Sequence, residues 1–177
     1  VDMHFLRQIR DMPGAPEEVH IYLAALALEN LNNPTEALLE LAEIPPQSPL
    51  AERALRWRVQ IMEEAGRIQE CLPIAREYAE KNPGSAEMQV IYSQVAGIVG
   101  ETETAVAVLR DAYAKWPDNP SVAFYLASYP DTLKQRDEAM KLMEVVVSVE
   151  PKTALAPNSA GYLPAADGPD RDRAHDL

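Results

Sequence analysis

Prolines recur in this chain at one fixed interval, and that interval constrains the fold more than any other feature of the sequence. Pro49, Pro83, Pro117 and Pro151 are equally spaced along the chain. The chain has 15 prolines, yet four at a single spacing are hard to ascribe to chance. Proline has no backbone N–H and cannot continue a helix, so a regular series predicts units that end at equivalent points. The sequence therefore predicts an internal repeat with this interval.

The stretch 100–117 indicates what one half of each unit looks like. Ala105, Leu109 and Ala112 are four and three residues apart, which places them on one face of a helix. Gly100 precedes this helix, where a tight turn needs a residue that tolerates positive φ. Pro117 follows it and ends it.

Residues of the same kind recur one repeat interval before and after this helix. The positions equivalent to Ala105 carry small side chains, which we expect to be buried between paired helices: Ala37, Cys71 and Ala139. The positions equivalent to Leu109 are apolar: Leu41, Ala75 and Met143. The earlier positions equivalent to Gly100 carry residues that tolerate left-handed geometry: Gly66 and Asn32.

A 34-residue unit with two helical stretches resembles the tetratricopeptide repeat (TPR), in the form common in bacterial proteins. The second half of the TPR pattern is matched best by Ala105, Leu109 and Pro117, whereas no Trp opens the first half and its glycine is present only as Gly161. The resemblance covers nearly the whole chain. It implies an all-α fold, a right-handed superhelical solenoid of antiparallel helix pairs, with the first helix of each pair on the concave face.

Residues 1–177 are expected to form a single TPR-like solenoid fragment. Residues 1–14 would be the second helix of a truncated repeat, and residues 152–177 an incomplete, degenerate fifth repeat. Four repeats are expected between them: 17–49, 50–83, 84–117 and 118–151. The sequence thus predicts that the chain begins inside a longer protein.

Polar residues followed by proline predict where three of the helices begin. Asn or Ser accepts a hydrogen bond from the first turn, and proline fits the first helical position because its missing N–H has no partner there. The predicted N-caps with their prolines are Asn33-Pro34, Ser48-Pro49 and Asn119-Pro120.

The two ends are expected to be the least regular parts. Pro130 and Pro164 lie within the first helices of the last two units and should end or bend them about a turn early. Apolar side chains near both ends are expected to need a neighbour that the chain does not supply: Phe5, Leu6 and Ile9, and Val145, Val146 and Val149. This predicts self-association through the ends.

Composition excludes several classes of partner. Net charge is −12, from 28 acidic and 16 basic residues, which argues against a nucleic-acid backbone and against an anionic membrane surface. No run of about 18 apolar residues is present, so no membrane-spanning helix is expected. Residues 1–12 are amphipathic and charged, unlike a signal peptide. The resemblance to bacterial repeat proteins suggests the cell envelope, as a periplasmic protein or lipoprotein, with the cytoplasm as the alternative.

Catalytic and metal-binding patterns are not found in the sequence. His4, His20 and His175 are far apart in the repeat order, and no HExxH, CxxC or glycine-rich phosphate loop occurs. Cys71 occupies a small-residue position, so we interpret it as a buried residue and not as a nucleophile. The acidic stretch 167–176 does not have the spacing of a calcium loop. We expect no cofactor, no metal and no enzymatic activity within these residues.

The remaining candidate site is the concave face that the resemblance implies. Its residues mix aromatic, amide and cationic side chains, which suit an extended peptide. The predicted peptide- or protein-binding residues are Tyr22, Arg53, Arg56, Gln60, Val90, Gln94, Phe124, Ser128, Asn158 and Tyr162. No lysine is present in these rows, which argues against the carboxylate clamp that some TPR proteins use.

Three functions are compatible with such a fold. The favoured one is a non-catalytic scaffold that binds a protein or peptide. The alternative is a regulatory or targeting segment of a larger enzyme whose catalytic part lies outside these residues. A pentatricopeptide-type RNA reader has a similar design, but the net charge of −12 counts against it.

Overall fold

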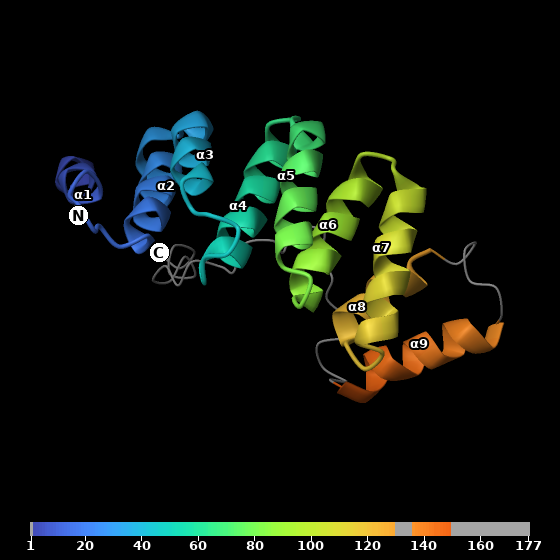
Figure 1. The fold of residues 1–177 in the computed structure, drawn as a ribbon. Helices are drawn as coiled ribbons and strands as arrows, with labels where there is room; N and C mark the ends of the chain where they lie inside the picture. Colours follow the sequence, from blue (N-terminus) through green and yellow to red (C-terminus); the bar gives the residue numbers. More distant parts are fainter. Residues whose placement is uncertain (1, 130–135, 150–177) are drawn as a thin grey trace, which may run out of the picture.

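The computed structural model describes residues 2–129 and 136–149, and every regular element in them is an α-helix. This confirms the predicted all-α, TPR-like solenoid. Figure 1 shows α2 to α7 standing side by side and α9 running across the far end. The helices are α1 (Met3–Arg10), α2 (Glu18–Leu31), α3 (Pro34–Ala42), α4 (Ala51–Glu64), α5 (Ile68–Lys81), α6 (Ala86–Ile98), α7 (Thr102–Lys115), α8 (Pro120–Ala127) and α9 (Arg136–Val149).

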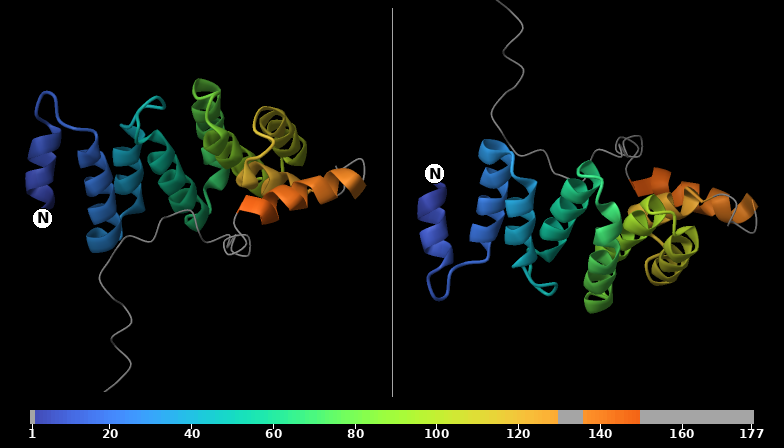
Figure 2. Two further views of the ribbon diagram at one scale, coloured as in Figure 1. Left: turned by 90° about the horizontal axis from the view of Figure 1, so that it is seen from below. Right: turned by 90° about the horizontal axis from the view of Figure 1, so that it is seen from above.

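Helices adjacent in sequence pack as pairs, α2 with α3, α4 with α5, α6 with α7 and α8 with α9. The first three pairs are joined by short turns (32–33, 65–67 and 99–101), which force the two helices of a pair to run antiparallel. The helix α1 packs against α2 at one end of the row, and α9 lies at the other end (Figure 2). The result is an elongated stack in which each pair contacts mainly its neighbours.

Left-handed residues close the first helix of three pairs, as predicted. Asn32, Gly66 and Gly100 have φ values of 46°, 69° and 88°. The residue after each of these glycines donates a backbone hydrogen bond back to the last turn, from Arg67 to the Met62 carbonyl at 2.7 Å and from Glu101 to the Ala96 carbonyl at 2.8 Å. These bonds satisfy helix-end carbonyls that would otherwise have no partner.

Two of the three predicted N-caps are confirmed. The side chains of Asn33 and Asn119 accept the backbone N–H of the residue three positions later, and a proline follows each. The side chain of Ser85 caps α6 with the same hydrogen bond, to the backbone N–H three positions later.

The prediction that Ser48 caps α4 is wrong. The N-cap of α4 is Leu50, and the helix begins at Ala51. Ser48 instead lies in a preceding turn, where its carbonyl accepts the Ala51 N–H at 3.0 Å and its hydroxyl accepts the Leu50 N–H at 3.1 Å. The same hydroxyl donates to Glu17, so Ser48 links this turn to the start of α2.

The predicted buried register holds through α7 and fails in α9. Ala37, Cys71 and Ala105 have no exposed surface, and Leu41, Ala75 and Leu109 are also buried. Ala139, by contrast, is only partly buried, and Met143 is half exposed. The buried side chains of α9 are Leu142 and Val146, which pack against Leu126 of α8 and Leu109 of α7. Compared with the predicted register, the buried face of α9 is therefore turned about the helix axis by about one residue.

The short helix α8 accounts for this change. It has 8 residues, against 14 in α2 and α4 and 13 in α6. This agrees with the helix shortening expected from Pro130, which itself lies outside the described residues, as does Pro164. With so short a partner, α9 packs across α8 and not alongside a full-length first helix. Val146, expected to need cover from a further repeat, is already buried by this packing.

Candidate binding surface on the first helices

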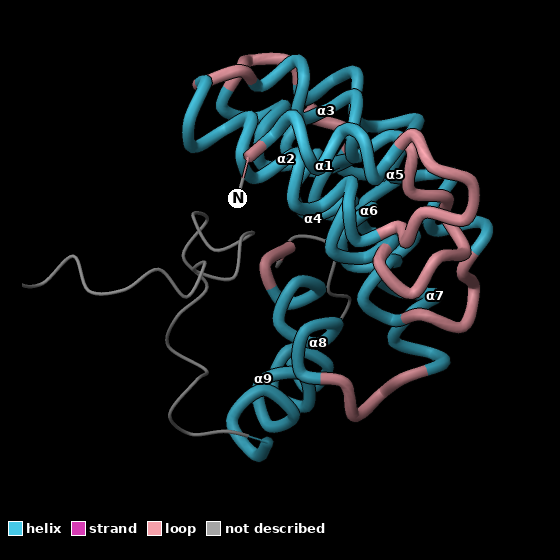
Figure 3. Tube along the Cα trace, turned by 90° about the vertical axis from the view of Figure 1, so that its left-hand side faces the viewer, coloured by secondary structure: helices cyan, strands magenta, loops and turns pink. Residues whose placement is uncertain are grey.

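The first helices of neighbouring pairs contact one another, α4 with α6 and α6 with α8. Viewed from the N-terminal end, α2, α4 and α6 lie towards one side of the stack and α3, α5 and α7 towards the other (Figure 3). The predicted site residues within the described chain all belong to α2, α4, α6 and the C-terminal half of α8.

Arg56 ties α4 to α6 on this side of the stack. Its Nη2 lies 3.1 Å from Glu52 Oε1, one turn earlier in α4, and 3.4 Å from Glu87 Oε2 in α6. All three side chains are partly exposed, so solvent screens the pairs and each contributes little to stability. Their main effect is to fix the position of the guanidinium. Glu87 was not among the predicted site residues, although it lies one repeat interval after Arg53 and carries the opposite charge.

Arg53 is exposed on the first turns of α4, and its guanidinium carbon lies 5.5 Å from the centre of the Trp57 ring. The indole is almost fully buried and therefore rigid. A cation held over an aromatic ring is partly ordered before any ligand arrives. Arg53 is thus a positioned cation on α4, and Trp57, which was not among the predicted site residues, supports it.

Gln60 and Gln94 occupy equivalent positions on α4 and α6, and the structure brings both to the first-helix side. The Gln60 amide donates to Glu64 Oε1 at 3.0 Å. The side-chain carbonyl oxygens of both glutamines are buried and have no hydrogen-bond partner among the described residues. Gln94 is only 9% exposed, which contradicts the expectation that it would be open to a ligand.

Tyr125 of α8 contacts Gln94, and burial raises the pKa of its phenol while a hydrogen bond from the Gln94 amide opposes this. The ring of Tyr125 meets Phe124 edge-on, with centroids 5.2 Å apart. Phe124 is half-buried, so part of its ring faces solvent. Phe124 was among the predicted site residues, whereas Tyr125, one residue beyond the predicted row, was not.

The remaining predicted residues fall into three groups. Tyr22 is exposed on α2, and Ser128 is exposed at the end of α8, where its hydroxyl donates to the carbonyls of Phe124 and Tyr125. Val90 is buried against Ala112 of α7 and Val122 of α8. Asn158 and Tyr162 lie outside the described residues.

The expected continuous rows are therefore interrupted at α6. The helix α8 packs across α6, and the contact between Val122 and Val90 closes that part of the surface. Besides Ser128, whose hydroxyl is bonded to carbonyls of its own helix, the accessible predicted residues are Tyr22 on α2, Arg53, Arg56 and Gln60 on α4, and Phe124 on α8. We call these five residues the first-helix surface.

Cys71 is the single cysteine of the chain and lies in the buried register. Cys71 has no exposed surface, and burial raises its thiol pKa to about 11, so it stays protonated and unreactive at neutral pH. This confirms its interpretation as a small buried residue. Over the described ranges, no three His, Cys, Asp or Glu side chains are grouped so as to hold a metal ion.

The most compact group of charges lies between α1, α2 and α3. The buried carboxylate of Glu40 accepts a hydrogen bond from Arg10 and lies 2.8 Å from His20 Nδ1. Arg7 pairs with Glu36 beside it. Each charge in this group has an opposite partner, which is the arrangement of a structural cluster and not of a reactive site.

These helix pairs define the class of the fold, a TPR-like helical-repeat solenoid. A solved structure of MamA has the same architecture, with a TM-score of 0.60, 14% sequence identity, and coverage of 86% of this chain and 88% of that chain. At this identity the similarity concerns the fold alone. No protein-family model and no curated protein matches the chain. No helix in the described part of the chain is long and apolar enough to span a membrane.

Proposed function

We propose that this chain is a non-catalytic scaffold that binds an extended segment of a partner protein across the first-helix surface. The TPR-like fold supports an interaction role at the general level. The specific site is supported by one observation: α2, α4 and α8, first helices of their pairs, carry exposed or partly exposed aromatic, amide and cationic side chains. The proposed units of the scaffold are the bacterial-type repeats 17–49, 50–83, 84–117 and 118–151.

Each of these side chains suits a different part of a peptide. The rings of Tyr22 and Phe124 can cover apolar side chains. Among the described residues the Gln60 carbonyl has no partner, and rotation of its amide would let it accept a backbone N–H from a peptide. A buried, unpaired carbonyl costs about 1–3 kcal/mol, so a ligand that pairs with it recovers free energy. Arg53 would hold an acidic side chain.

The proposal is tested with peptides selected from a random library on the immobilised 177-residue chain. Their affinities are then measured by calorimetry for the parent and for Phe124→Ala. The substitution should weaken binding by more than about 1 kcal/mol, as expected for an aromatic anchor. Phe5→Ala is the matched control, since Phe5 is an exposed phenylalanine on α1, a helix that carries none of the five residues of the first-helix surface.

Gln60→Met serves as a second variant, because Phe124 also packs against the core of α8 and α9. It keeps the length of the side chain and removes the carbonyl. We expect it to weaken binding while the melting temperature stays near that of the parent. Selected peptides that bind all three variants with the affinity of the parent would place the binding site elsewhere.

A further inference from the structure

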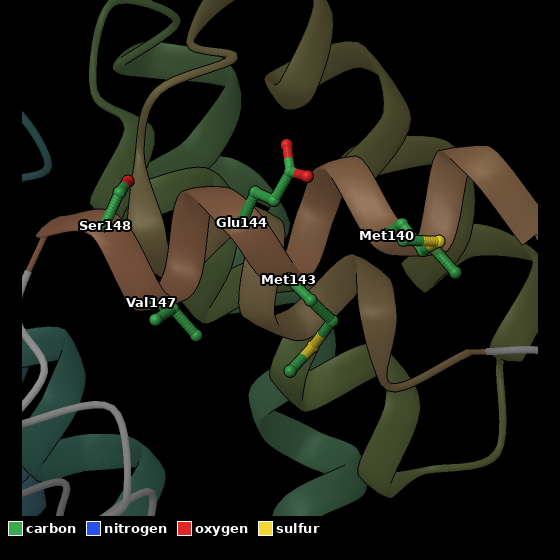
Figure 4. Close-up of a pocket in the computed structure, with 6 residues that line it drawn as sticks. Met140, Met143, Glu144, Val147 and Ser148 are labelled. Atoms are coloured by element: carbon green, nitrogen blue, oxygen red, sulfur yellow. The ribbon is translucent and has the colours of Figure 1, made fainter.

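Three large apolar side chains lie in a row on the exposed face of α9. Met140, Met143 and Val147 are 55%, 50% and 54% exposed. They line an open depression with Ala139, Glu144 and Ser148. Figure 4 shows Met143 and Val147 leaving one edge of the helix, while Glu144 and Ser148 leave the other. An exposed row of this kind marks an interaction surface more often than an ordinary solvated face.

The contrast with α7 shows that the row is unusual within this fold. Leu109 in α7 is fully buried, whereas Met143, one repeat interval later, is half exposed. The cause is the packing of α9 on the short helix α8, which covers Leu142 and Val146 and leaves the opposite face open. In the described residues, no other helix covers that face.

We propose that this face of α9 binds the same face of a second copy of the chain, with the two α9 helices antiparallel about a two-fold axis. The spacing i, i+3, i+7 forms the narrow apolar seam of a paired helix. In the antiparallel arrangement Met140 of each copy lies against Val147 of the other, and the two Met143 side chains meet near the axis. Both rows are thus covered by a single contact, and closed two-fold symmetry limits the assembly to a dimer.

Charge favours a second copy as the occupant. Lys141 and Glu144 are exposed along the polar edge of the row. When Met140 meets Val147, Lys141 of one copy is offset from Glu144 of the other by two residues, about 3 Å along the axis, which the lysine side chain can span. Symmetry creates this opposite-charge contact twice. A helix without the matching charges would gain only the apolar contact.

The contact is small, so the association should be weak, with a dissociation constant on the order of 10–100 μM. Each copy carries a net charge of −12, and the two copies repel one another at long range. Salt screens this repulsion, so raising the NaCl concentration from about 0.05 M to 0.5 M should strengthen the dimer. An assembly held mainly by ion pairs would weaken instead, and that result would contradict the apolar seam.

Sedimentation equilibrium of the 177-residue chain measures the dimer directly. Met143→Glu places a carboxylate in the seam and should weaken association at least 10-fold. Met12→Glu is the matched control, because Met12 is 61% exposed and lies before α2, at the other end of the stack. It should change the dissociation constant less than about twofold. A parent chain that stays monomeric to about 500 μM, or equal effects of the two substitutions, would overturn the proposal.

A charge-reversal experiment tests the antiparallel pairing itself. Lys141→Glu and Glu144→Lys should each weaken self-association, because each creates two like-charge contacts across the axis. An equimolar mixture of the two variants should recover the affinity of the parent, since both contacts are then opposite in charge. A mixture that associates no better than its components would overturn the pairing. The Met143 methyl group could also prove to be protected from solvent in the monomeric parent chain. That result would show that another part of the same chain covers this face of α9, and it would overturn the dimer proposal.

Discussion

Small side chains at equivalent positions set how closely paired helices approach. Ala37, Cys71 and Ala105 have no exposed surface, so nothing larger fits between the helices without displacing a backbone. Ala139 occupies the same sequence register but is only partly buried, because α9 has rotated on the short helix α8. The same residue type in the same register therefore has a different environment at the two positions.

This difference predicts unequal costs for the same substitution. Ala105→Leu should overpack the contact between α6 and α7 and lower the free energy of unfolding by about 1–3 kcal/mol. Ala139→Leu is the matched control and should cost less than about 0.5 kcal/mol, since its side chain can extend towards solvent. Urea denaturation of both variants measures this. Equal costs would show that Ala139 is as enclosed as Ala105.

Helix α1 is held to the stack in a different way from the other helices. It has no fully buried residue. Arg7 and Arg10 instead form ion pairs with Glu36 and Glu40 of α3, and Glu40, only 5% exposed, also contacts His20. Hydrogen bonds to a charged group in a partly buried position contribute about 1.5–3 kcal/mol, so Glu40 should carry much of the docking of α1.

Glu40→Gln should therefore loosen α1 selectively. Amide hydrogen exchange of residues 3–10 should become about 10-fold faster, while exchange in α4 and α5 stays unchanged. Glu43→Gln is the control, because Glu43 is exposed at the end of the same helix. Similar exchange of α1 in the parent and in the Glu40 variant would show that apolar contacts of Met3, Leu6 and Ile9 hold the helix without the ion pairs.

The elements that the sequence predicted were those specified by local chemistry. The left-handed residues, the caps at Asn33 and Asn119 and the buried register through α7 each depend on residues within one or two turns. The start of α4 was missed because Ser48 serves a turn that also contacts Glu17, 31 residues away. The rotation of α9 was missed because it follows from the length of α8 and not from any residue in α9.

The candidate site was predicted less completely than the fold. A repeat interval identifies which positions share a row, but not which rows a neighbouring helix covers. Tyr22, Arg53, Arg56 and Phe124 are accessible as expected, whereas Val90 and Gln94 are buried because α8 crosses α6 at that point. The Arg56–Glu87 pair joins two helices, and its geometry depends on the angle between them.

At the scale of the whole molecule, the apolar core is divided along the stack. One cluster extends from Ile21 in α2 to Val95 in α6. A second joins Leu109 of α7 to α8 and α9, and a smaller one around Val90 links α6 to α8. Each pair in the stack contacts mainly its neighbours. We therefore expect the parts of the stack built on separate clusters to unfold locally as separate cooperative units. The α8–α9 end should thus open at a lower free energy than the α2–α5 part.

Two leucine substitutions test this division. Leu126→Ala removes a fully buried side chain from the second cluster and should cost about 2–5 kcal/mol locally. At dilute concentration, amide protection in α8 and α9 should fall at least 30-fold, while α4 and α5 keep theirs, since opening of one end does not expose the first cluster. Leu55→Ala in α4 is the matched change in the first cluster and should lower protection in α4 and α5. If Leu126→Ala lowers protection equally from α2 to α9, the stack unfolds as one cooperative unit and the divided core has no energetic consequence.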